Sequence, residues 1–362
     1  MKEKGVISTN QYIWLLFCII TSFATLHVPR LLILQGGRDA WLSVVFAWFL
    51  DVLLAIVYAY MGIRFPGQNM VEYSTTILGK KLGKIAGLLF IIFFLLVSAT
   101  LQKGLSLIII SAFFPNTPAE VILITSYIVV GYAVLKGIEV IGRVCEILGP
   151  IYLASLIILF LLVIPELKID RLKPQLELGL YPSLSAVPVI LSFIGVCIIM
   201  GMYIPICNRP GNGFIGKFIA VSLGSSMIIL LTISSIGVFS WPQSKNMIAI
   251  SLELARHIHI GDFFQRVEVI WLMTASGAAI ITSANLIWAF SSGLSQILGL
   301  KAYKPLVIPS ILVSFVIGIT SFSSSLDLVN FAFYSLPIFA IIIETGLEMF
   351  LFITALIFKK SG

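Results

Sequence analysis

The sequence predicts an all-α polytopic membrane protein in which ten transmembrane helices form two inverted halves of five. Three observations predict this fold: the composition, the number of long apolar runs, and a similarity between the two halves. Of the 362 residues, 59% are hydrophobic and 11% are charged, whereas soluble proteins average about 45–50% apolar and about 25% charged residues. The composition excludes a soluble enzyme, a disordered chain, and a single-span anchor that carries a large soluble domain.

The long apolar runs give the number of spans. A helix needs about 20 mostly apolar residues to cross the hydrocarbon layer, and backbone groups find no water there, so helices are the expected form. The predicted spans are 12–34, 40–63, 85–113, 119–135, 145–164, 183–207, 214–239, 265–293, 305–322 and 330–358. Turn residues or charges fill every gap between them. We therefore expect one transmembrane domain over residues 1–362.

The basic residues predict the orientation of the spans. An even number of spans places both termini on one side, and fourteen of the 23 lysines and arginines lie toward that side, among them Lys217 near the start of a predicted span. Eight fall on the other side, and Lys103 lies inside a predicted span. Because basic loops stay in the cytoplasm, we expect both termini to be cytoplasmic. The net charge of +7 then needs no nucleic-acid partner.

No pattern of metal ligands or paired cysteines stands out. His257 and His259 are close in sequence, but no third ligand is near them. The four cysteines have neither the spacing of a zinc site nor that of a disulfide framework, and they read as small core residues: Cys18, Cys145, Cys197 and Cys207. We expect no metal and no cofactor.

Two short segments carry the internal similarity. Residues 69–74, after the second span, read NMVEYS, and residues 246–251, after the seventh, read NMIAIS. The halves would cover about 11–164 and 183–358. Inverted repeats are typical of transporters that hold a ligand where the first helix of each half is interrupted. Hydroxylated residues, glycine and proline predict such interruptions in helices 1 and 6, although small residues also serve close helix packing.

A series of short segments then indicates a family. In order they are Val28-Pro29-Arg30, Gly37-Arg38-Asp39-Ala40-Trp41, Arg143, Pro150, Asp170-Arg171-Leu172-Lys173-Pro174, Gly179, Ser192-Phe193-Ile194-Gly195 and Gly261-Asp262-Phe263-Phe264-Gln265-Arg266-Val267-Glu268. Through them the chain resembles the B subunits of spore germinant receptors, which are related to the amino acid–polyamine–organocation transporters. The resemblance runs over some 340 residues.

The resemblance implies a LeuT-type fold in the spore inner membrane or the bacterial cell membrane. It also implies A and C subunits as partners and a small nutrient, often an amino acid, as the ligand that triggers germination. Carried over by position, the pocket consists of Thr21, Ser22, Phe23, Ala24, Thr25, Phe93, Val97, Thr100, Ser192, Phe193, Gly195, Cys197, Thr274 and Thr282. Ser22 and Ala24 stand where relatives often have glycine, and Cys197 stands where some have glutamate.

Five ionisable residues are expected inside the membrane, where each costs about 2.5–3.5 kcal/mol or more and so faces a partner or a cavity. They are Asp51, Lys103, Glu268, Glu344 and Glu348. We expect Lys103 to pair with Asp51, Glu344 or Glu348; the alternative is that it is the counter-ion of a ligand carboxylate. Glu344 and Glu348 are one helical turn apart and so could share a proton.

Three functions remain open on the sequence. The first is a nutrient sensor that binds its ligand without turnover, and the second is a secondary amino-acid transporter coupled to H⁺ or Na⁺. A channel-like subunit that passes water or ions is a third. Fold alone does not separate them, and the resemblance favours the sensor. An enzyme is not expected, because no nucleophile elbow or phosphate-binding loop is found.

Overall fold

The computed structural model is built from helices, of which the first described one begins at Thr9 and the last ends at Ile357. It describes residues 5–177, 179–247, 249–258, 267–322 and 324–362, without the side chains of Phe23 and Val267. The α-helices are α1 (Thr9–Gly36), α2 (Ala40–Arg64), α3 (Met70–Leu78), α4 (Lys80–Phe113), α5 (Ala119–Lys136), α6 (Ile138–Val163), α7 (Tyr181–Ser185), α8 (Val187–Ile194), α9 (Met200–Tyr203), α10 (Gly213–Phe239), α11 (Trp241–Ser244), α12 (Ile250–Arg256), α13 (Val267–Leu298), α14 (Lys304–Thr320), α15 (Ser325–Asn330), α16 (Leu336–Ala340) and α17 (Glu348–Ile357). The 3₁₀ turns are η1 (Gly37–Asp39), η2 (Ile164–Glu166), η3 (Ile169–Leu172), η4 (Gly195–Ile199), η5 (Ile204–Ile206) and η6 (Pro210–Asn212), and the π turns are η7 (Phe331–Ser335) and η8 (Ile341–Leu347).

Side chains fix the starts of two helices. Ser8 Oγ accepts a hydrogen bond from Gln11 N at 3.1 Å, and Gln11 Oε1 accepts one from Ser8 N at 3.0 Å. Asn69 and Glu72 form the same reciprocal pair at the start of α3. Such capping boxes satisfy amide groups that the first helical turn leaves unpaired. The two capping boxes therefore fix the residues at which α1 and α3 begin.

Eight helical stretches in the described part of the chain are long and apolar enough to cross a membrane. The expected count was ten. One stretch runs from Ala24 to Arg64, through η1 without a gap, so that two predicted spans count as one. Lys304–Thr320 is apolar but only 17 residues long. Each predicted span nevertheless has a helical counterpart, because the apolar runs and the breaks between them are visible in the sequence.

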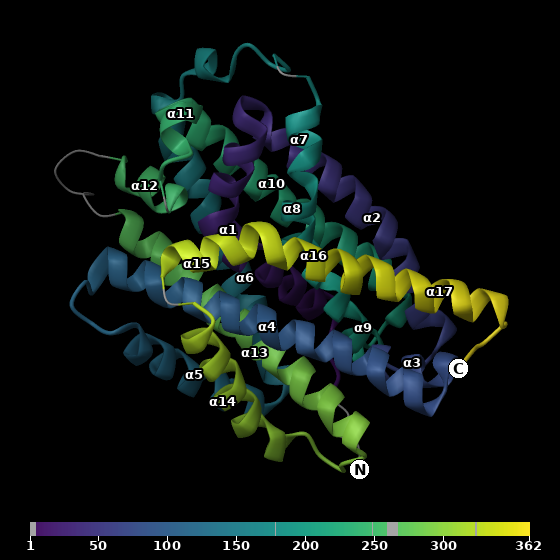
Figure 1. Cartoon of the computed structure of the whole chain (residues 1–362). Helices are drawn as coiled ribbons and strands as arrows, with labels where there is room; N and C mark the ends of the chain where they lie inside the picture. The colour runs from purple at the N-terminus through teal and green to yellow at the C-terminus, as the bar shows by residue number, and fades with distance from the viewer. Residues whose placement is uncertain (1–4, 178, 248, 259–266, 323) are drawn as a thin grey trace.

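The long helices pack around α1 (Figure 1). It contacts α10, α6, α13 and α8, while α4 lies along α13 and α10 along α2. The segment from α15 to α17 crosses the front of this view over α4, and α5 and α14 lie below it. Residues on α1, α4, α8 and α13 are therefore brought into one interior.

The two ends of the chain lie at the same end of the bundle. Ile7 N donates to Ile206 O at 3.0 Å, and Gly362 N donates to Arg64 O at 3.2 Å. Gly5 and Gly67 line one cavity there. We call this the termini end, and the opposite end, where α4 finishes at Phe113, the far end.

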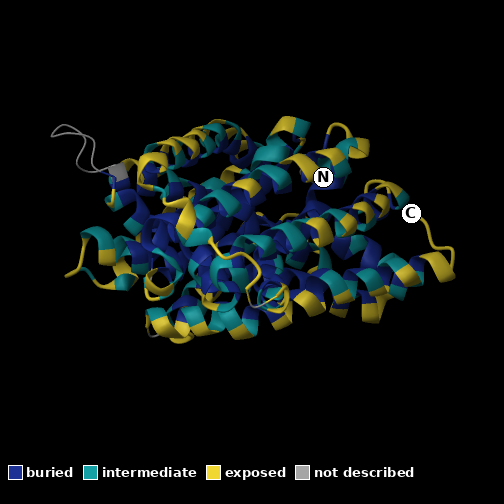
Figure 2. Cartoon of the chain, turned by 90° about the horizontal axis from the view of Figure 1, so that it is seen from above, coloured by how far each residue is buried: buried dark blue, intermediate teal, exposed yellow. Residues whose placement is uncertain are grey.

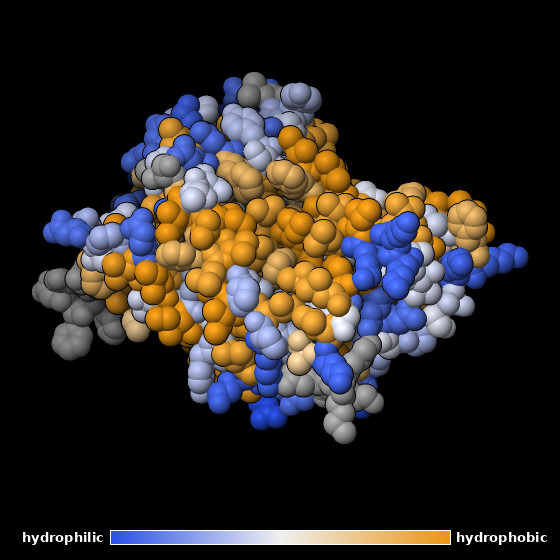
Figure 3. Space-filling model, turned by 60° about the horizontal axis from the view of Figure 1, so that its bottom comes forward, coloured by the Kyte–Doolittle hydropathy of each residue, from blue (hydrophilic) through white to orange (hydrophobic). Residues whose placement is uncertain are grey.

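Apolar side chains cover much of the outer surface. Phe49, Ile56 and Leu161 are 57%, 53% and 56% exposed. Figure 3 shows a broad hydrophobic region across the middle of one face, with hydrophilic residues gathered toward its edges. Seen from above, buried residues fill the inside of the bundle and the exposed ones form its rim (Figure 2). This distribution suits a lipid environment, because exposed apolar area is unfavourable in water.

Helix 1 is continuous, so the predicted interruption there is wrong. The α-helix runs unbroken from Thr9 to Gly36 through Pro29. Thr21 Oγ1 donates to Phe17 O and Thr25 Oγ1 to Thr21 O, both at 2.7 Å. Hydroxyls that bond to the preceding turn of their own helix need no unwinding, and Ser22 and Ala24 lack the backbone freedom of the glycines seen in relatives.

Helix 6 is interrupted, as predicted. The α-helical turns of α8 give way to the 3₁₀ turn η4, and η5 follows the short α9. All five residues of η4 are buried. A 3₁₀ stretch inside a longer helix is wound more tightly and has poorer hydrogen-bond geometry. It often marks a hinge, where the helix can change conformation. We call η4 the helix-6 break.

Candidate functional site

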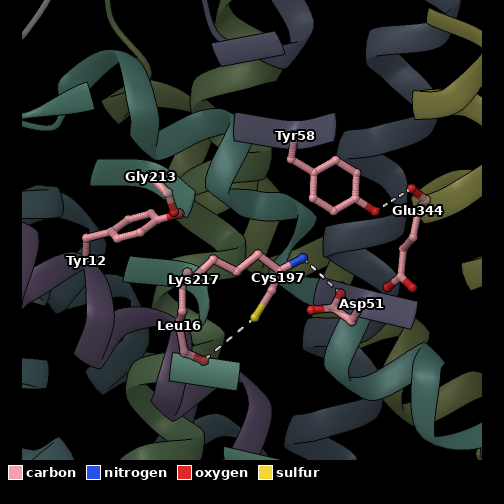
Figure 4. A network of polar contacts seen from close by, with 8 residues as sticks. All are labelled: Tyr12, Leu16, Asp51, Tyr58, Cys197, Gly213, Lys217 and Glu344. Carbon is pink, nitrogen blue, oxygen red and sulfur yellow. Dashed lines mark hydrogen bonds and ion pairs between the residues drawn. The ribbon is translucent and has the colours of Figure 1, made fainter. Parts of the chain in front are cut away.

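A buried ion pair lies beside the helix-6 break. Lys217 Nζ on α10 donates to Asp51 Oδ1 on α2 at 2.9 Å, and both side chains are fully buried. The ammonium group also lies 4.4 Å from the ring centroid of Tyr58. Figure 4 shows Lys217 and Asp51 meeting next to Cys197 of the break. A buried pair is held by its mutual attraction and by added contacts such as the ring, since each charge has lost its water.

The expected pairing of Lys103 with Asp51, Glu344 or Glu348 is wrong. Lys103 is 4% exposed, but it has no carboxylate partner within 4 Å in the described part of the chain. Asp51 pairs with Lys217 instead. The sequence predicted Lys217 near the start of a span, on the side of the termini, whereas the structure buries it in the second turn of α10.

Glu344 and Glu348 lie in the same helical region but face different neighbours. Tyr73 Oη donates to Glu348 Oε1 at 2.7 Å. Glu344 points toward the helix-6 break: a Cβ built on Gly195 would lie 2.1 Å from Glu344 Oε2. Tyr58 Oη donates to the backbone oxygen of Glu344 at 2.7 Å. The two carboxyl groups thus have different neighbours. The structure therefore does not support a proton shared between Glu344 and Glu348.

On helix 1, the predicted ligand residues face the interior. Thr21, Ser22, Ala24 and Thr25 are 0% exposed. Thr25 Oγ1 lies 2.5 Å from Tyr152 Oη on α6, and Thr25 O accepts a hydrogen bond from Ser251 Oγ. The side chain of Phe23 lies outside the described part of the structure. The carbonyls and hydroxyls of this segment are thus engaged within the protein.

The predicted residues on helix 6 join the break to its neighbours. Ser192 Oγ donates to Val189 O at 2.7 Å, and Phe193 is 6% exposed. Cys197 is buried, and its thiol lies 3.9 Å from Leu16 O on α1. Gly195 faces Glu344, so this glycine keeps room for a carboxyl group of the last membrane-spanning stretch, Ser325–Ile357, which we call the last helix.

Helices α4 and α13 supply the remaining predicted residues. Phe93 is fully buried, Val97 is half-buried, and Thr100 Oγ1 donates to Leu96 O at 2.9 Å. Thr274 Oγ1 lies 3.0 Å from Ser155 Oγ of α6. Thr282 is 2% exposed. The structure places these residues in the same packed interior as α1 and the break.

Several buried polar groups in this interior have no hydrogen-bond partner among the described residues. They are both amide atoms of Gln102, both amide atoms of Asn285, and Thr282 Oγ1. Ser98 Oγ and Ser283 Oγ, 2.6 Å apart, join α4 and α13 at this level. Gln102 is one turn beyond Ser98, and Thr282 and Asn285 flank Ser283. An unpaired buried polar group costs about 1–3 kcal/mol, so these groups are available to a polar ligand.

Two cavities open toward the ends of the bundle. One of about 530 Å³ lies at the far end between α4, α12 and α15, with His27 and Arg256 in its wall. Another, of about 910 Å³, lies at the termini end. Trp288 lines the second cavity and stacks on the buried ring of Tyr203, with centroids 5.8 Å apart. Among the described residues, none of the predicted ligand residues lines either of these two cavities.

Charged side chains of α6 meet polar side chains of α1 at the termini end of the bundle. Arg143 lies 3.7 Å from Glu139, and both are exposed at the termini end. Glu146 accepts hydrogen bonds from Asn10 and Gln11 instead of from Arg143. Glu268 is 7% exposed, whereas Arg266 and His259 lie outside the described residues.

The four cysteines are free thiols, and all are buried. In the described part of the chain, no group of three or more acidic, histidine or cysteine side chains could hold a metal ion. Burial raises the pKa of the Cys207 thiol, in the loop at the termini end, to about 12.

Residues 6–326 match the family described as spore germination protein. The chain belongs to this family. Three members from Bacillus subtilis (strain 168) are similar to it. Spore germination protein KB is 27% identical over 99% of this chain and 96% of its own length. Spore germination protein YndE is 27% identical over 80% and 81%, and spore germination protein A2 is 25% identical over 83% and 81%.

Solved structures confirm the fold that the spore germination family was expected to have. A Na⁺-coupled sialic acid symporter in a substrate-bound, outward-open state matches with a TM-score of 0.68 at 14% identity, over 96% of this chain and 79% of that one. Mhp1, a nucleobase-cation-symport-1 family transporter, matches with a TM-score of 0.59 at 14% identity, over 91% and 75%. The chain therefore has the fold of LeuT-type transporters.

Sequence reasoning missed four residues of this interior: Lys217, Tyr58, Gln102 and Asn285. Gln102 gave a usable signal, because an amide next to Lys103 interrupts a long apolar run. Asn285 gave a similar signal, because its amide interrupts the apolar run of the eighth predicted span. Lys217 gave none, since it stands where a loop charge is common.

Proposed function

We propose that this protein is the B subunit of a spore germinant receptor, and that it binds a small nutrient, most simply an amino acid, in its closed interior. The set of unpaired buried polar groups on α4 and α13 carries the proposal. A ligand with its own donors and acceptors satisfies groups that the protein leaves unpaired. Family membership supports the germination role.

The ligand site comprises the predicted residues of helices 1, 3, 6 and 8, together with Gln102 and Asn285. The helix-6 break gives this site one wall that can change conformation. Since the cavities at both ends stop short of it, the ligand enters by a movement of the surrounding helices. A site closed in this way suits a sensor, which needs occupancy and a conformational change but no passage.

The topology proposed for this function is ten spans in two inverted halves, about 11–164 and 183–358, within one domain. The helical counterpart of each predicted span supports the count, and the shared end of the two termini supports an even number. The excess of basic residues supports cytoplasmic termini. The proposed location is the spore inner membrane or the bacterial cell membrane.

Replacing Gln102 or Asn285 with leucine is expected to weaken amino-acid binding at least tenfold while raising the free energy of unfolding by about 1 kcal/mol, because each change removes an unpaired buried amide. Equilibrium binding and thermal unfolding of the purified protein measure the two effects. Gln35→Leu is the matched control. Gln35 lies at the end of α1, where it donates to Ser185 O at 2.9 Å, so its loss lowers stability and leaves affinity unchanged. Unchanged affinity in both test variants would remove the two amides from the site.

A and C subunits are the proposed partners, by analogy with the germinant receptors that this chain resembles. Spores that lack the gene are expected to lose the response to at least one nutrient and to regain it when the gene is restored. Restoration with Gln102→Leu is expected to shift the response to a higher nutrient concentration. A deletion that leaves the response to every nutrient unchanged would count against the receptor role.

The second candidate is a secondary transporter coupled to H⁺ or Na⁺. The fold shared with two cation-coupled symporters favours it. It differs from the sensor in one observable, which is net movement of solute across the membrane.

A further inference from the structure

The carboxyl group of Glu344 faces the buried ion pair from the opposite side (Figure 4). Figure 4 shows the carboxyls of Glu344 and Asp51 pointing toward the same space below Tyr58, with Lys217 at its edge. Glu344 is 2% exposed, and its Oε1 has no hydrogen-bond partner among the described residues. Asp51 Oδ2 also has no hydrogen-bond partner among them. Residues from α2, α10 and the last helix thus meet beside the helix-6 break.

The charges in this cluster do not balance unless one carboxyl is neutral. Lys217 supplies one positive charge and bonds directly to Asp51. An ionised Glu344 would be a second negative charge without its own cation, in a place from which water is excluded, and such a group takes up a proton instead.

We propose that Asp51, Lys217 and Glu344 form a proton-binding site, with the proton on Glu344, and that this site holds the last helix against the helix-6 break. Gly195 is part of the site, because any larger residue would occupy the position of Glu344 Oε2. Loss of the proton leaves two carboxylates competing for Lys217. Glu344 then moves toward the ammonium group and away from Gly195, which frees the break.

Other ionisable groups surround Glu344 without supplying a second cation. Lys103 of α4 makes no ion pair with a described carboxylate, and Glu348 is bonded to Tyr73. The groups on the elements packed around Glu344 are Asp51, Tyr58, Cys197, Lys217, Lys103 and Glu348. The site is distinct from Gln102 and Asn285, and its test does not depend on nutrient binding.

Infrared spectroscopy of the full-length protein in liposomes tests the site, because a protonated carboxyl has its own carbonyl stretch. Wild-type protein is expected to show a band that Glu344→Gln removes. Asp51→Asn should remove the same band although Glu344 is present, because Lys217 then pairs with Glu344 and ionises it. Lys217→Met should add a band, since Asp51 then takes up a proton. Glu348→Gln is the matched control and leaves the Glu344 band in place.

Three results would overturn the proposal. The first is an unchanged spectrum in Glu344→Gln, which would mean that Glu344 is ionised in the wild type. The second is retention of the Glu344 band in Asp51→Asn, which would separate Glu344 from the ion pair. The third is loss of the band when Na⁺ replaces choline at constant pH, which would make a metal cation the occupant. If Lys217→Met does not fold, the Asp51→Asn comparison decides alone.

Discussion

Lys217→Met is expected to lower the free energy of unfolding by about 3–5 kcal/mol, the usual cost of leaving one member of a buried ion pair without its partner. Asp51 would remain fully buried on α2 with neither oxygen paired. The contact of the ammonium group with Tyr58 would be lost as well. Chemical or thermal unfolding of the protein in detergent measures the change.

Two controls separate the ion pair from general damage. Lys81→Met removes an exposed lysine from the first turn of α4 and is expected to change stability by less than about 0.5 kcal/mol. Asp51→Asn combined with Lys217→Met should recover most of the loss, because a buried amide, unlike the unpaired carboxyl of Asp51, needs no proton to be neutral. If the double variant is as unstable as Lys217→Met, the packing of the lysine side chain, and not its charge, stabilises the fold.

Gly195→Ala is expected to destabilise the protein by about 1–3 kcal/mol, the cost of forcing an extra carbon into a filled interior. The added Cβ would lie 2.1 Å from Glu344 Oε2 and 2.7 Å from Glu344 Cδ. Glu344 would have to leave the break. We also expect the nutrient response of spores carrying this variant to be lost, since the break can no longer close against the last helix.

A second substitution checks this cause. Glu344→Ala makes room for the new methyl group, so Gly195→Ala with Glu344→Ala should cost less than the two single changes together. Gly211→Ala is the control, because a Cβ there meets nothing within 4 Å. If the two changes at 195 and 344 are additive, the two residues are not in contact in the functional protein.

Much of the fold follows from local features that a sequence displays. Apolar runs of the right length predicted the spans, and the prolines and glycine of residues 182–205 predicted the interruption of helix 6. The family was also evident from short segments in a fixed order. Helix 1 shows the limit of such reasoning, because Thr21 and Thr25 satisfy their hydroxyls within a continuous helix.

The ion pair could not be predicted, because its members are separated by 166 residues. Asp51 and Glu344 were recognisable as buried charges from their apolar surroundings. Their partner was not, since Lys217 stands four residues after the start of α10, where a basic residue commonly belongs to a loop. Which distant side chains meet depends on the packing of α2, α10 and the last helix, and local sequence does not encode that packing.

One measurement tests the central claim most directly: binding and uptake of labelled amino acids by the same purified protein in liposomes, with and without gradients of H⁺ and Na⁺. We predict saturable binding that Gln102→Leu and Asn285→Leu weaken, with no accumulation of the label under either gradient. Accumulation driven by an ion gradient would contradict this account and make the protein a transporter.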